Sequence, residues 1–561
     1  MRLIMQSAFS QRSIRPVVFV AILVMVCGAG PALAASSGRN SGQREYQQGL
    51  QAMRNDDVAA AIRSFRLALI ALPKSPEVHY SLGSAYLKSG DVDKAVVEFR
   101  KAIALKPDYS EAYFNMAVAL ERRNDLNGAR TFYQYAVKLR PQWAEAHDAL
   151  GFLLAHNGDL PGAKTEFETA TRLRPDLADA HLHLGTTLWL LKQYSEALEE
   201  LKKSVTLDPT NAAGHYYLGL AEQQQGKADE AFQQFHEAAG MNPPSADLHS
   251  KLGEAFEQLN DLEDAITEFR KAAALEPDSA EAHNNLGLAL VREGNADDAI
   301  PQFETAVQEK PKFYAARNNL GLAYLQKALW DKAEAVFRAL IQLNPNDAEA
   351  YYNLGVALKQ EEHFDAAVQS LNAAAQLAPE LPEPHYLLGV IFWQQGKLHQ
   401  AESELETAIR IQPDYARAHS ILGSVLRQEG NLDAALRELQ TAIKLDPTYG
   451  GSHQELGMVW RQKGNLMEAQ KEFQKASDLN KAKVNRLAAT IATNRGEQDL
   501  RDGNLDMAIQ QFRSAVKQSP DFARAHYALA RALLAKGDRS GAEAEFSKAH
   551  QLDPRLLAPS D

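Results

Sequence analysis

The chain has 561 residues, of which 45% are hydrophobic and 8% aromatic, so it is large and apolar enough to fold. Its formal net charge is −12, and an acidic chain is repelled by phosphate backbones, so nucleic acid is not expected as a partner. Cys27 is the single cysteine, which excludes disulfides, thiolate metal sites and cysteine nucleophiles from a product that has lost this residue.

The N-terminus has the pattern of a secretory signal peptide. Three arginines and no acid precede an apolar run over 17–27, and Ala-Leu-Ala at 32–34 has the small residues that signal peptidase requires. The sequence therefore predicts a signal peptide over 1–34, a short linker over 35–41, and an exported protein that is periplasmic or secreted. The alternative is an uncleaved membrane anchor, because the uncharged stretch 16–35 is about long enough to cross a bilayer.

A period of 34 residues fills the remaining chain. Counting each unit from 31 residues before its recurring proline predicts an array of thirteen units over 42–483, an insertion at 484–488, two further units over 489–556 and a tail at 557–561. Positions are numbered below from the first residue of each unit. Lys481 replaces the proline once, and the prolines themselves are Pro73, Pro107, Pro141, Pro175, Pro209, Pro243, Pro277, Pro311, Pro345, Pro379, Pro413, Pro447, Pro520 and Pro554.

Small and large residues alternate within each unit in a fixed way. Position 20 is alanine in all fifteen units, position 8 is glycine in thirteen, and position 24 is Phe, Tyr or Leu throughout. The small residues let two helices approach closely, and the large one fills the gap between them. Glycine at position 15, as at Gly90, suits the left-handed residue that ends a first helix, and the proline ends the second. Each unit is therefore predicted to be a helical hairpin that stacks on its neighbours.

These residues resemble the tetratricopeptide-repeat pattern of Leu-Gly at 7–8, Ala at 20, Phe at 24, Ala at 27 and Pro at 32, which is complete over 280–313. The resemblance covers residues 42–556. It implies an all-α fold, a right-handed superhelical solenoid of about fifteen hairpins whose first helices line the concave side. It also implies a scaffold that binds other proteins and has no catalytic activity.

Three places depart from the repeat. Pro301 lies inside a predicted second helix and is expected to kink it. Pro382 and Pro384 fall in a first turn, where proline is tolerated. The segment 478–494 has no proline stop and contains five additional residues, so we predict one long helix there and a change of direction between two subdomains.

No residues have the spacing of a catalytic, cofactor-binding or metal site, since neither a phosphate-binding glycine loop nor a His-Glu-x-x-His motif occurs. Histidine does recur at position 4 of ten units, but neighbouring units place such residues about 10 Å apart, too far for shared ligation of one ion. We interpret these histidines as packing residues that replace the family's bulky side chain. They are His79, His147, His181, His215, His249, His283, His385, His419, His453 and His526.

Position 6 of the first helix offers a candidate peptide-binding ladder. Asparagine stands there at Asn115 and in three consecutive units, at Asn285, Asn319 and Asn353. An asparagine amide can pair with a peptide backbone regardless of sequence, and helices about 10 Å apart match about three residues of an extended peptide. The pattern is similar to the asparagine ladder in the repeat arm of the O-linked N-acetylglucosamine transferases, without their catalytic domain. The alternative is that asparagine simply tolerates a half-exposed helical site.

Aromatic and acidic side chains share the predicted groove. Exposed aromatics typically anchor protein partners or stack on sugar rings, although some could pack between units instead. Acids at position 2, such as Glu77 and Asp179, favour basic partner segments. The candidate aromatics are Tyr80, Phe114, Tyr216, Tyr352 and Tyr386 at position 5, and Trp189 and Trp393 at position 12.

Two functions are consistent with these features. The first is an exported scaffold that holds protein partners, in envelope assembly, secretion or polysaccharide export. The second is a carbohydrate-binding module that serves surface-polysaccharide export. Neither requires a cofactor, and a membrane contact is expected only through an uncleaved N-terminal segment.

Overall fold

The computed structural model describes residues 36–556. These residues form 29 helices and no β-strand, which confirms the all-α repeat fold. The predicted signal peptide over 1–34 and the tail at 557–561 lie outside the described residues. No helix within the described part has both the length and the apolar character that crossing a membrane requires.

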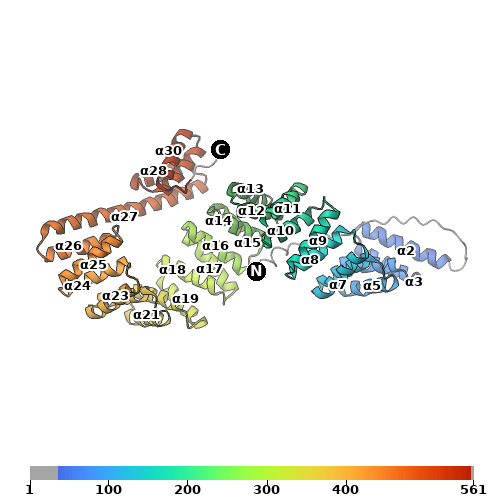
Figure 1. Cartoon of the computed structure of the whole chain (residues 1–561), viewed down its shortest axis with the longest axis horizontal. Helices are drawn as coiled ribbons and strands as arrows, with labels where there is room; N and C mark the ends of the chain where they lie inside the picture. The colour runs from blue at the N-terminus through green and yellow to red at the C-terminus, as the bar shows by residue number, and fades with distance from the viewer. Residues whose placement is uncertain (1–35, 557–561) are drawn as a thin grey trace. The chain divides into compact units, whose positions relative to one another are not determined.

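The described chain divides into two compact units, residues 36–311 and 312–556 (Figure 1). We call them the N-terminal and C-terminal units. The helices of the N-terminal unit are α2 (Ser36–Arg54), α3 (Val58–Ala71), α4 (Pro76–Lys88), α5 (Val92–Leu105), α6 (Ser110–Arg122), α7 (Leu126–Leu139), α8 (Ala144–His156), α9 (Leu160–Leu173), α10 (Ala178–Leu190), α11 (Tyr194–Leu207), α12 (Ala212–Gln224), α13 (Ala228–Gly240), α14 (Ala246–Gln258), α15 (Leu262–Leu275), α16 (Ala280–Glu293) and α17 (Ala296–Glu309).

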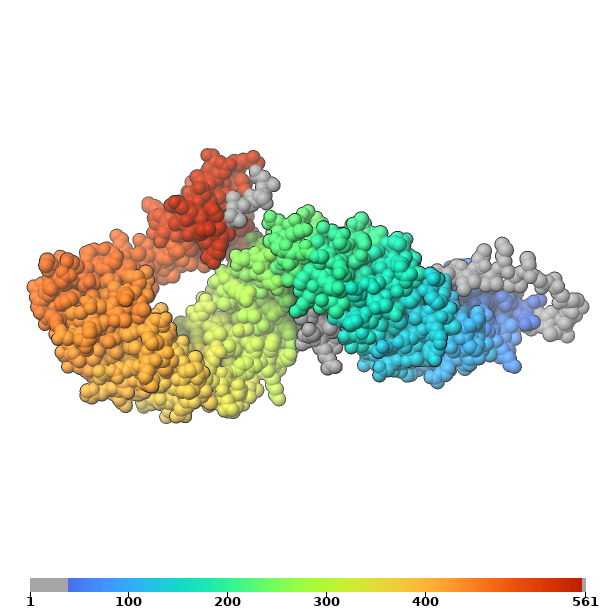
Figure 2. Space-filling model, in the orientation of Figure 1, coloured from blue at the N-terminus to red at the C-terminus, as the bar shows by residue number. Residues whose placement is uncertain are grey.

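The C-terminal unit contains the remaining hairpins, which lie against one another without a gap from α18 to α26 (yellow to orange in Figure 2). Its helices are α18 (Tyr314–Gln326), α19 (Trp330–Leu343), α20 (Ala348–Gln360), α21 (Phe364–Leu377), α22 (Pro382–Gln394), α23 (Leu398–Ile411), α24 (Ala416–Gln428), α25 (Leu432–Leu445), α26 (Gly450–Gln462), α27 (Leu466–Arg501), α28 (Leu505–Gln518), α29 (Ala523–Ala535) and α30 (Arg539–Leu552).

Close approach at positions 8 and 24 holds each hairpin together. A Cβ added to Gly83 would lie 2.8 Å from the Phe99 ring, and one added to Gly423 would lie 2.5 Å from Leu439 Cγ. In these hairpins glycine leaves room for the large residue at position 24, so the preference for glycine has a steric cause, although Ala117 and Ala530 occupy the same position in two other hairpins.

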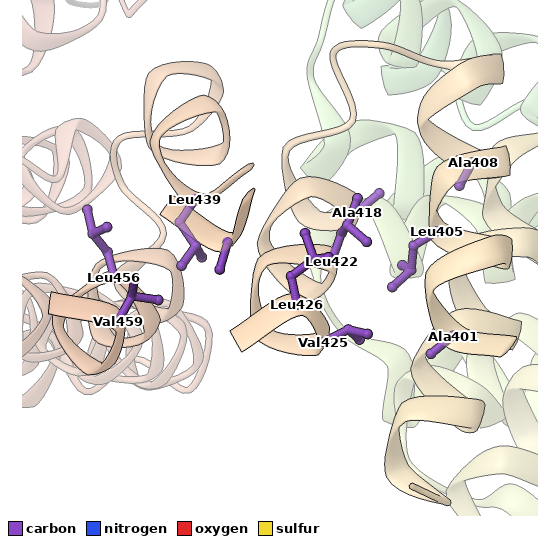
Figure 3. Packing of buried hydrophobic residues seen from close by; sticks show 11 residues of the cluster. Ala401, Leu405, Ala408, Ala418, Leu422, Val425, Leu426, Leu439, Leu456 and Val459 are labelled. Carbon is purple, nitrogen blue, oxygen red and sulfur yellow. The ribbon is translucent and has the colours of Figure 1, made fainter. Parts of the chain in front are cut away.

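Neighbouring hairpins share one continuous apolar core. In Figure 3, Leu422 and Leu426 of α24 lie between Leu405 of α23 and Leu439 of α25, and Leu456 of α26 extends the same cluster. Leu405 and Leu439 have no exposed surface. Stacking therefore buries the face that a single hairpin leaves open.

The turn between the two helices of a hairpin is left-handed at position 15 whatever residue stands there. Gly90 and Gly294 have φ of 84° and 95°, as predicted, but Lys192, Ala328 and Glu362 also have φ between 56° and 62°. A side chain in this region costs of order 1 kcal/mol, so the packed hairpin imposes the turn on residues that would not choose it.

Within each unit, first helices of successive hairpins pack on one another, as α10 does on α12 and α22 does on α24. No two neighbouring second helices of the described chain pack to the same extent. The stack therefore bends toward its first helices, and we call the surface formed by positions 2, 5, 6, 9, 12 and 13 of these helices the inner face.

Two of the observed helices cross predicted boundaries. Helix α2 begins at Ser36, so most of the predicted linker over 35–41 is helical, because no proline interrupts the helix that continues to Arg54. Helix α27 runs unbroken over 36 residues and includes the predicted insertion at 484–488 (Figure 1). The division between compact units nevertheless falls at Pro311 and not within α27, since α27 packs at its two ends on α26 and α28 of one unit.

Pro301 lies within α17, which continues past it to Glu309, so the predicted kink stays a prediction. Pro382 is the first residue of α22, at the tolerated position.

Candidate functional site

The four candidate asparagines have different surroundings. The Asn115 amide donates to the Tyr80 hydroxyl at 3.0 Å and to the Ser84 hydroxyl at 3.3 Å, so it ties α6 to α4. Asn353 is only 6% exposed, and its Nδ2 has no hydrogen-bond partner among the described residues. Asn285 and Asn319 are half-buried. Among the four, Asn353 is the one whose amide donor is buried without a hydrogen-bond partner in the described chain.

The predicted ladder crosses the division of the chain. Asn285 belongs to the N-terminal unit, whereas Asn319 and Asn353 belong to successive hairpins of the C-terminal unit. Asn319 and Asn353 lie in neighbouring hairpins of one unit, and the peptide-binding ladder stays a prediction.

In the N-terminal unit, the position-5 aromatics pack inside their own hairpins. Tyr80 lies 6.0 Å from Phe99 and 5.0 Å from Tyr109 between ring centroids. Burial raises the pKa of Tyr80 to about 12. Phe114 and Tyr216 are buried, at 4% and 8% exposure, with Phe114 stacked on Trp143 at 4.8 Å. These aromatics contribute to the core, the alternative that the sequence left open.

None of the candidate aromatics of the C-terminal unit is fully buried. Tyr352, Tyr386 and Trp393 are half-buried on the inner face, and Tyr386 lies 5.1 Å from the Tyr415 ring. Burial raises the pKa of the Tyr352 and Tyr386 hydroxyls, which keeps them neutral donors at neutral pH. Trp189, in the N-terminal unit, is also half-buried, and its Nε1 lacks a partner among the described residues.

Two of the acidic residues at position 2 form ion pairs with arginines of their own hairpins. Glu111 pairs with Arg140 at 3.2 Å, and Glu145 pairs with Arg174 at 2.6 Å. Position 2 thus contacts position 31 of the same hairpin. These acids have less charge to offer a partner than the sequence suggested.

The inner faces of the two units differ in charge. The six inner-face positions hold ten acidic and five basic residues in the N-terminal unit, but four acidic and seven basic residues in the C-terminal unit. The predicted preference for basic partner segments is therefore expected on the inner face of the N-terminal unit only.

The ten position-4 histidines form a polar contact that the sequence interpretation missed. In every one of these hairpins the Nδ1 atom contacts the residue 19 positions later, as His79 contacts Glu98 at 2.5 Å and His419 contacts Glu438 at 2.6 Å. In seven hairpins Nε2 also lies 3.0–3.2 Å from the carbonyl oxygen of the preceding repeat proline, as His419 does from Pro413. We call this arrangement the histidine clamp.

The histidine clamp joins three chain segments: a first helix, its second helix and the loop from the previous hairpin. A carboxylate and a carbonyl both accept, so an imidazolium that donates from both nitrogens satisfies them together. At His215 and His283 the acceptor at position 23 is a neutral glutamine instead, at 2.8 Å. The signal was available in the sequence, because Glu or Gln stands at position 23 wherever histidine stands at position 4.

Two groups of side chains bring possible metal ligands together. Glu334, Glu361 and His363 have ligand atoms within 4.8 Å of one another, as have His399, Glu402 and Glu429. A hydrogen bond to Asp331, burial and the nearby Glu334 raise the pKa of Glu361 to about 7. A shared proton is enough to relieve the repulsion, so this geometry does not require a metal ion.

Comparison with protein families identifies the repeat in several segments of the chain. A model described as TPR repeat matches residues 83–123, 190–226 and 258–294, and models described as tetratricopeptide repeat match 111–142 and 499–556. A model of the C-terminal domain of cilia and flagella-associated protein 70 matches 280–490. No curated protein matches the chain.

Several solved structures are similar to the chain over long stretches. The Cut9–Hcn1 hetero-tetramer of APC/C is 15% identical, with 91% of this chain and 94% of that chain covered and a TM-score of 0.34. Yeast Tom70 is 18% identical over 78% and 92%, with a TM-score of 0.32. YrrB, described as a TPR protein with an unusual peptide-binding site, is 29% identical over 33% and 95%, with a TM-score of 0.28.

Proposed function

Because the chain belongs to the tetratricopeptide-repeat family, a family of scaffolds for protein–protein interaction, we propose that it is an exported scaffold whose inner face binds extended protein segments. Export is supported by the N-terminal sequence pattern of basic residues, apolar run and small residues before Ala35. Envelope assembly, secretion and polysaccharide export are the processes in which such a scaffold would serve.

The observation that carries the proposal is the unused amide donor of Asn353. A buried donor without a partner costs about 1–3 kcal/mol, which a bound peptide carbonyl would recover. Asn353 lies on α20, one residue from Tyr352, and its side chain is 6% exposed. A backbone carbonyl is available from any sequence, so this contact favours a peptide over a ligand with a specific side chain.

Neighbouring residues supply the rest of a peptide site. Tyr352, Tyr386 and Trp393 are half-buried on the inner faces of α20 and α22, where aromatic side chains are typical anchors of bound segments. Asn319 occupies the equivalent place on α18 and extends the site by one hairpin. A segment in extended conformation would span about three residues for each hairpin.

A display selection tests the proposal. A randomised library of short peptides is selected on the immobilised full chain, and the enriched peptides are titrated by fluorescence anisotropy. Asn353→Ala is expected to weaken binding about tenfold, the equivalent of one lost hydrogen bond to a buried donor. Asn372→Ala, at an exposed asparagine of α21, is the matched control and should bind as the wild type does.

Two results would count against peptide binding at this site. The first is a selection that enriches no peptide on the full chain. The second is an equal affinity of Asn353→Ala and wild type for every enriched peptide, which would move the binding surface elsewhere.

A carbohydrate-binding function is the second candidate. It is supported by the half-buried indoles on position 12, where Trp189 keeps an unpaired Nε1 and Trp393 packs beside the α23–α26 core. Indole rings stack on sugar rings, and an N–H donor can reach a sugar hydroxyl. Binding on a glycan array that disappears with Trp393→Ala would favour it, and a blank array would remove it.

A further inference from the structure

The middle of α27 exposes an apolar stripe. Val484, Leu487 and Ile491 are 65%, 62% and 48% exposed and follow one another at spacings of three and four residues. This spacing places them on one narrow face of the helix. We call these three residues the α27 seam.

The α27 seam points away from the hairpin that the same helix begins. Ala489, Ala492 and Gly496 of α27 are buried, and Ala489 and Ala492 pack with Ala515 of α28 and Ala525 of α29. On a helix with about 3.6 residues per turn, Ala489 and Gly496 lie roughly opposite the seam, and Ala492 lies between the seam and that buried side. The fold of this chain therefore leaves the seam unused.

The seam is uncovered because α27 joins two hairpins without a loop. At the other junctions within each unit, the first helix of a hairpin folds back on the preceding second helix, as α26 does on α25, where Ile443 at position 28 is partly buried. A continuous helix cannot fold back on itself. At this point, position 28 is the exposed Ser477, so the usual packed junction is absent. The three large apolar residues of the seam lie further along the same helix.

Unpaired positive charge surrounds the seam. Lys481, Lys483 and Arg495 are exposed, and none of them forms an ion pair within residues 36–556. The segment 475–495 contains five basic residues and one acid, in a chain whose formal net charge is −12. A local excess of this sign is a recognition feature for a negatively charged partner.

We propose that the α27 seam binds an amphipathic helix of another protein, with its apolar residues in the seam and acidic residues on both flanks. The spacing of Val484, Leu487 and Ile491 is that of a coiled-coil seam, which accepts one partner helix. Asn480 and Asn494 continue the same spacing at each end and limit the apolar contact to about two turns.

Two other occupants fit less well. A second copy in antiparallel orientation would bring Lys481 near Arg495 of the partner's helix, and in parallel orientation it would bring each cation near its own counterpart. Both arrangements place like charges together. A membrane surface requires a broad apolar face, whereas this seam is narrow, ends in asparagine and belongs to a helix held by α26 and α28.

The test uses the full chain and two synthetic helical peptides of three heptads with leucine at a and d. One peptide carries glutamate at the flanking e and g positions, and the other carries lysine. By fluorescence anisotropy at low salt, the glutamate peptide is expected to bind about tenfold more tightly than the lysine peptide, and salt should weaken it.

Variants assign the binding to the seam. Leu487→Glu is expected to weaken the glutamate peptide about tenfold, because it removes an apolar contact and adds a like charge. Leu466→Glu is the matched control, since Leu466 is 69% exposed on the same helix but lies outside the seam. Reversal of Lys481, Lys483 and Arg495 to glutamate should exchange the preference for the two peptides.

Each contrary result overturns the proposal. Equal binding of the two peptides, or an equal effect of Leu466→Glu, would remove the acidic helix as the partner. Concentration-dependent dimerisation lost in Leu487→Glu would assign the seam to a second copy. Sedimentation with anionic lipid vesicles that Leu487→Glu abolishes, without peptide binding, would assign it to a membrane, and no binding of any kind would leave the seam without a function.

Discussion

Two places in the C-terminal unit connect one hairpin to the next in different ways: the junction between α25 and α26, and the corresponding point within α27. At the first, a loop turns the chain back, and Leu439, Leu456 and Val459 bury one shared core. At the second, the chain continues as helix, and the packing position holds the exposed Ser477. The hairpins on both sides are intact. A hairpin can therefore form whether or not it packs on its neighbour at the junction.

The histidine clamp adds a contact at junctions where a loop precedes a hairpin with histidine at position 4. His419 binds the carbonyl oxygen of Pro413 in the loop that precedes its hairpin, as well as Glu438. The hairpin that begins within α27 has no preceding loop, and Ala492 stands at its position 4. The contact with a proline carbonyl therefore needs a preceding loop. The clamp is not a condition for a packed junction, because Tyr113 and Tyr351 stand at position 4 where α6 packs on α5 and α20 packs on α19.

The largest expected effect comes from truncating leucine on each side of this comparison. Leu439→Ala removes a fully buried side chain and should cost about 2–5 kcal/mol, whereas Leu487→Ala, at an exposed site, should stay within about 0.5 kcal/mol. Hydrogen exchange of α24–α26 and of α27 measures both locally. Comparable losses would mean that α27 is covered in solution.

A Cβ added at position 8 tests whether the hairpins themselves are equivalent. In Gly423→Ala the new atom would lie 2.5 Å from Leu439 Cγ, and in Gly496→Ala it would lie 2.5 Å from the Phe512 ring. Each should cost about 1–3 kcal/mol, because the close helix approach is the same before and within α27. Urea unfolding of the two variants provides the measurement. A tolerated Gly496→Ala would show that the hairpin after α27 is packed more loosely.

The smallest expected effect is the pH dependence of the stability that the histidine clamps contribute. The hydrogen bond to Glu438 raises the pKa of His419, despite burial. The charged histidine therefore stabilises the folded state below its ordinary pKa of about 6.5, and this contribution is lost as the pH rises through the raised value.

The carboxylates of the histidine clamps determine how stability changes at low pH. Burial opposes the charge of Glu98, but hydrogen bonds from His79 and Lys101 outweigh it and lower the pKa of this carboxyl. The pKa of Glu268 is lowered in the same way by His249 and Lys271. Their contribution is present above the ordinary carboxyl pKa of about 4.5 and is lost as the pH falls through the lowered values. Stability from the clamps should therefore be greatest between about pH 4.5 and 6.5.

Thermal unfolding between pH 6 and 8.5 tests this dependence. The wild type should lose stability across the range, and His419→Gln should reduce the loss by less than about 1 kcal/mol, since one partly buried pair is removed. His283→Gln is the control, because its partner Gln302 is neutral and gains nothing from a charged imidazole. An identical change in slope for both variants would separate the pH dependence from the histidine–glutamate contacts.

The sequence by itself determined the hairpins and their sites of interruption. The prolines, the alanines at position 20 and the glycines at position 8 predicted the helix pairs correctly, and the missing proline at Lys481 predicted the continuous α27. Such features are readable because a hairpin is closed by contacts between residues only about 16 positions apart, as Gly83 and Phe99 are.

The tertiary structure alone decided which side chains remain available. Phe114 and Tyr216 were candidate anchors by position, but packing buried them, whereas Asn353 kept a buried donor without a hydrogen-bond partner among the described residues. The same holds for the histidine clamp and for the left-handed turns at Lys192 and Ala328. Their surroundings depend on packing between helices and hairpins, which a repeat pattern implies in general but does not specify for one residue.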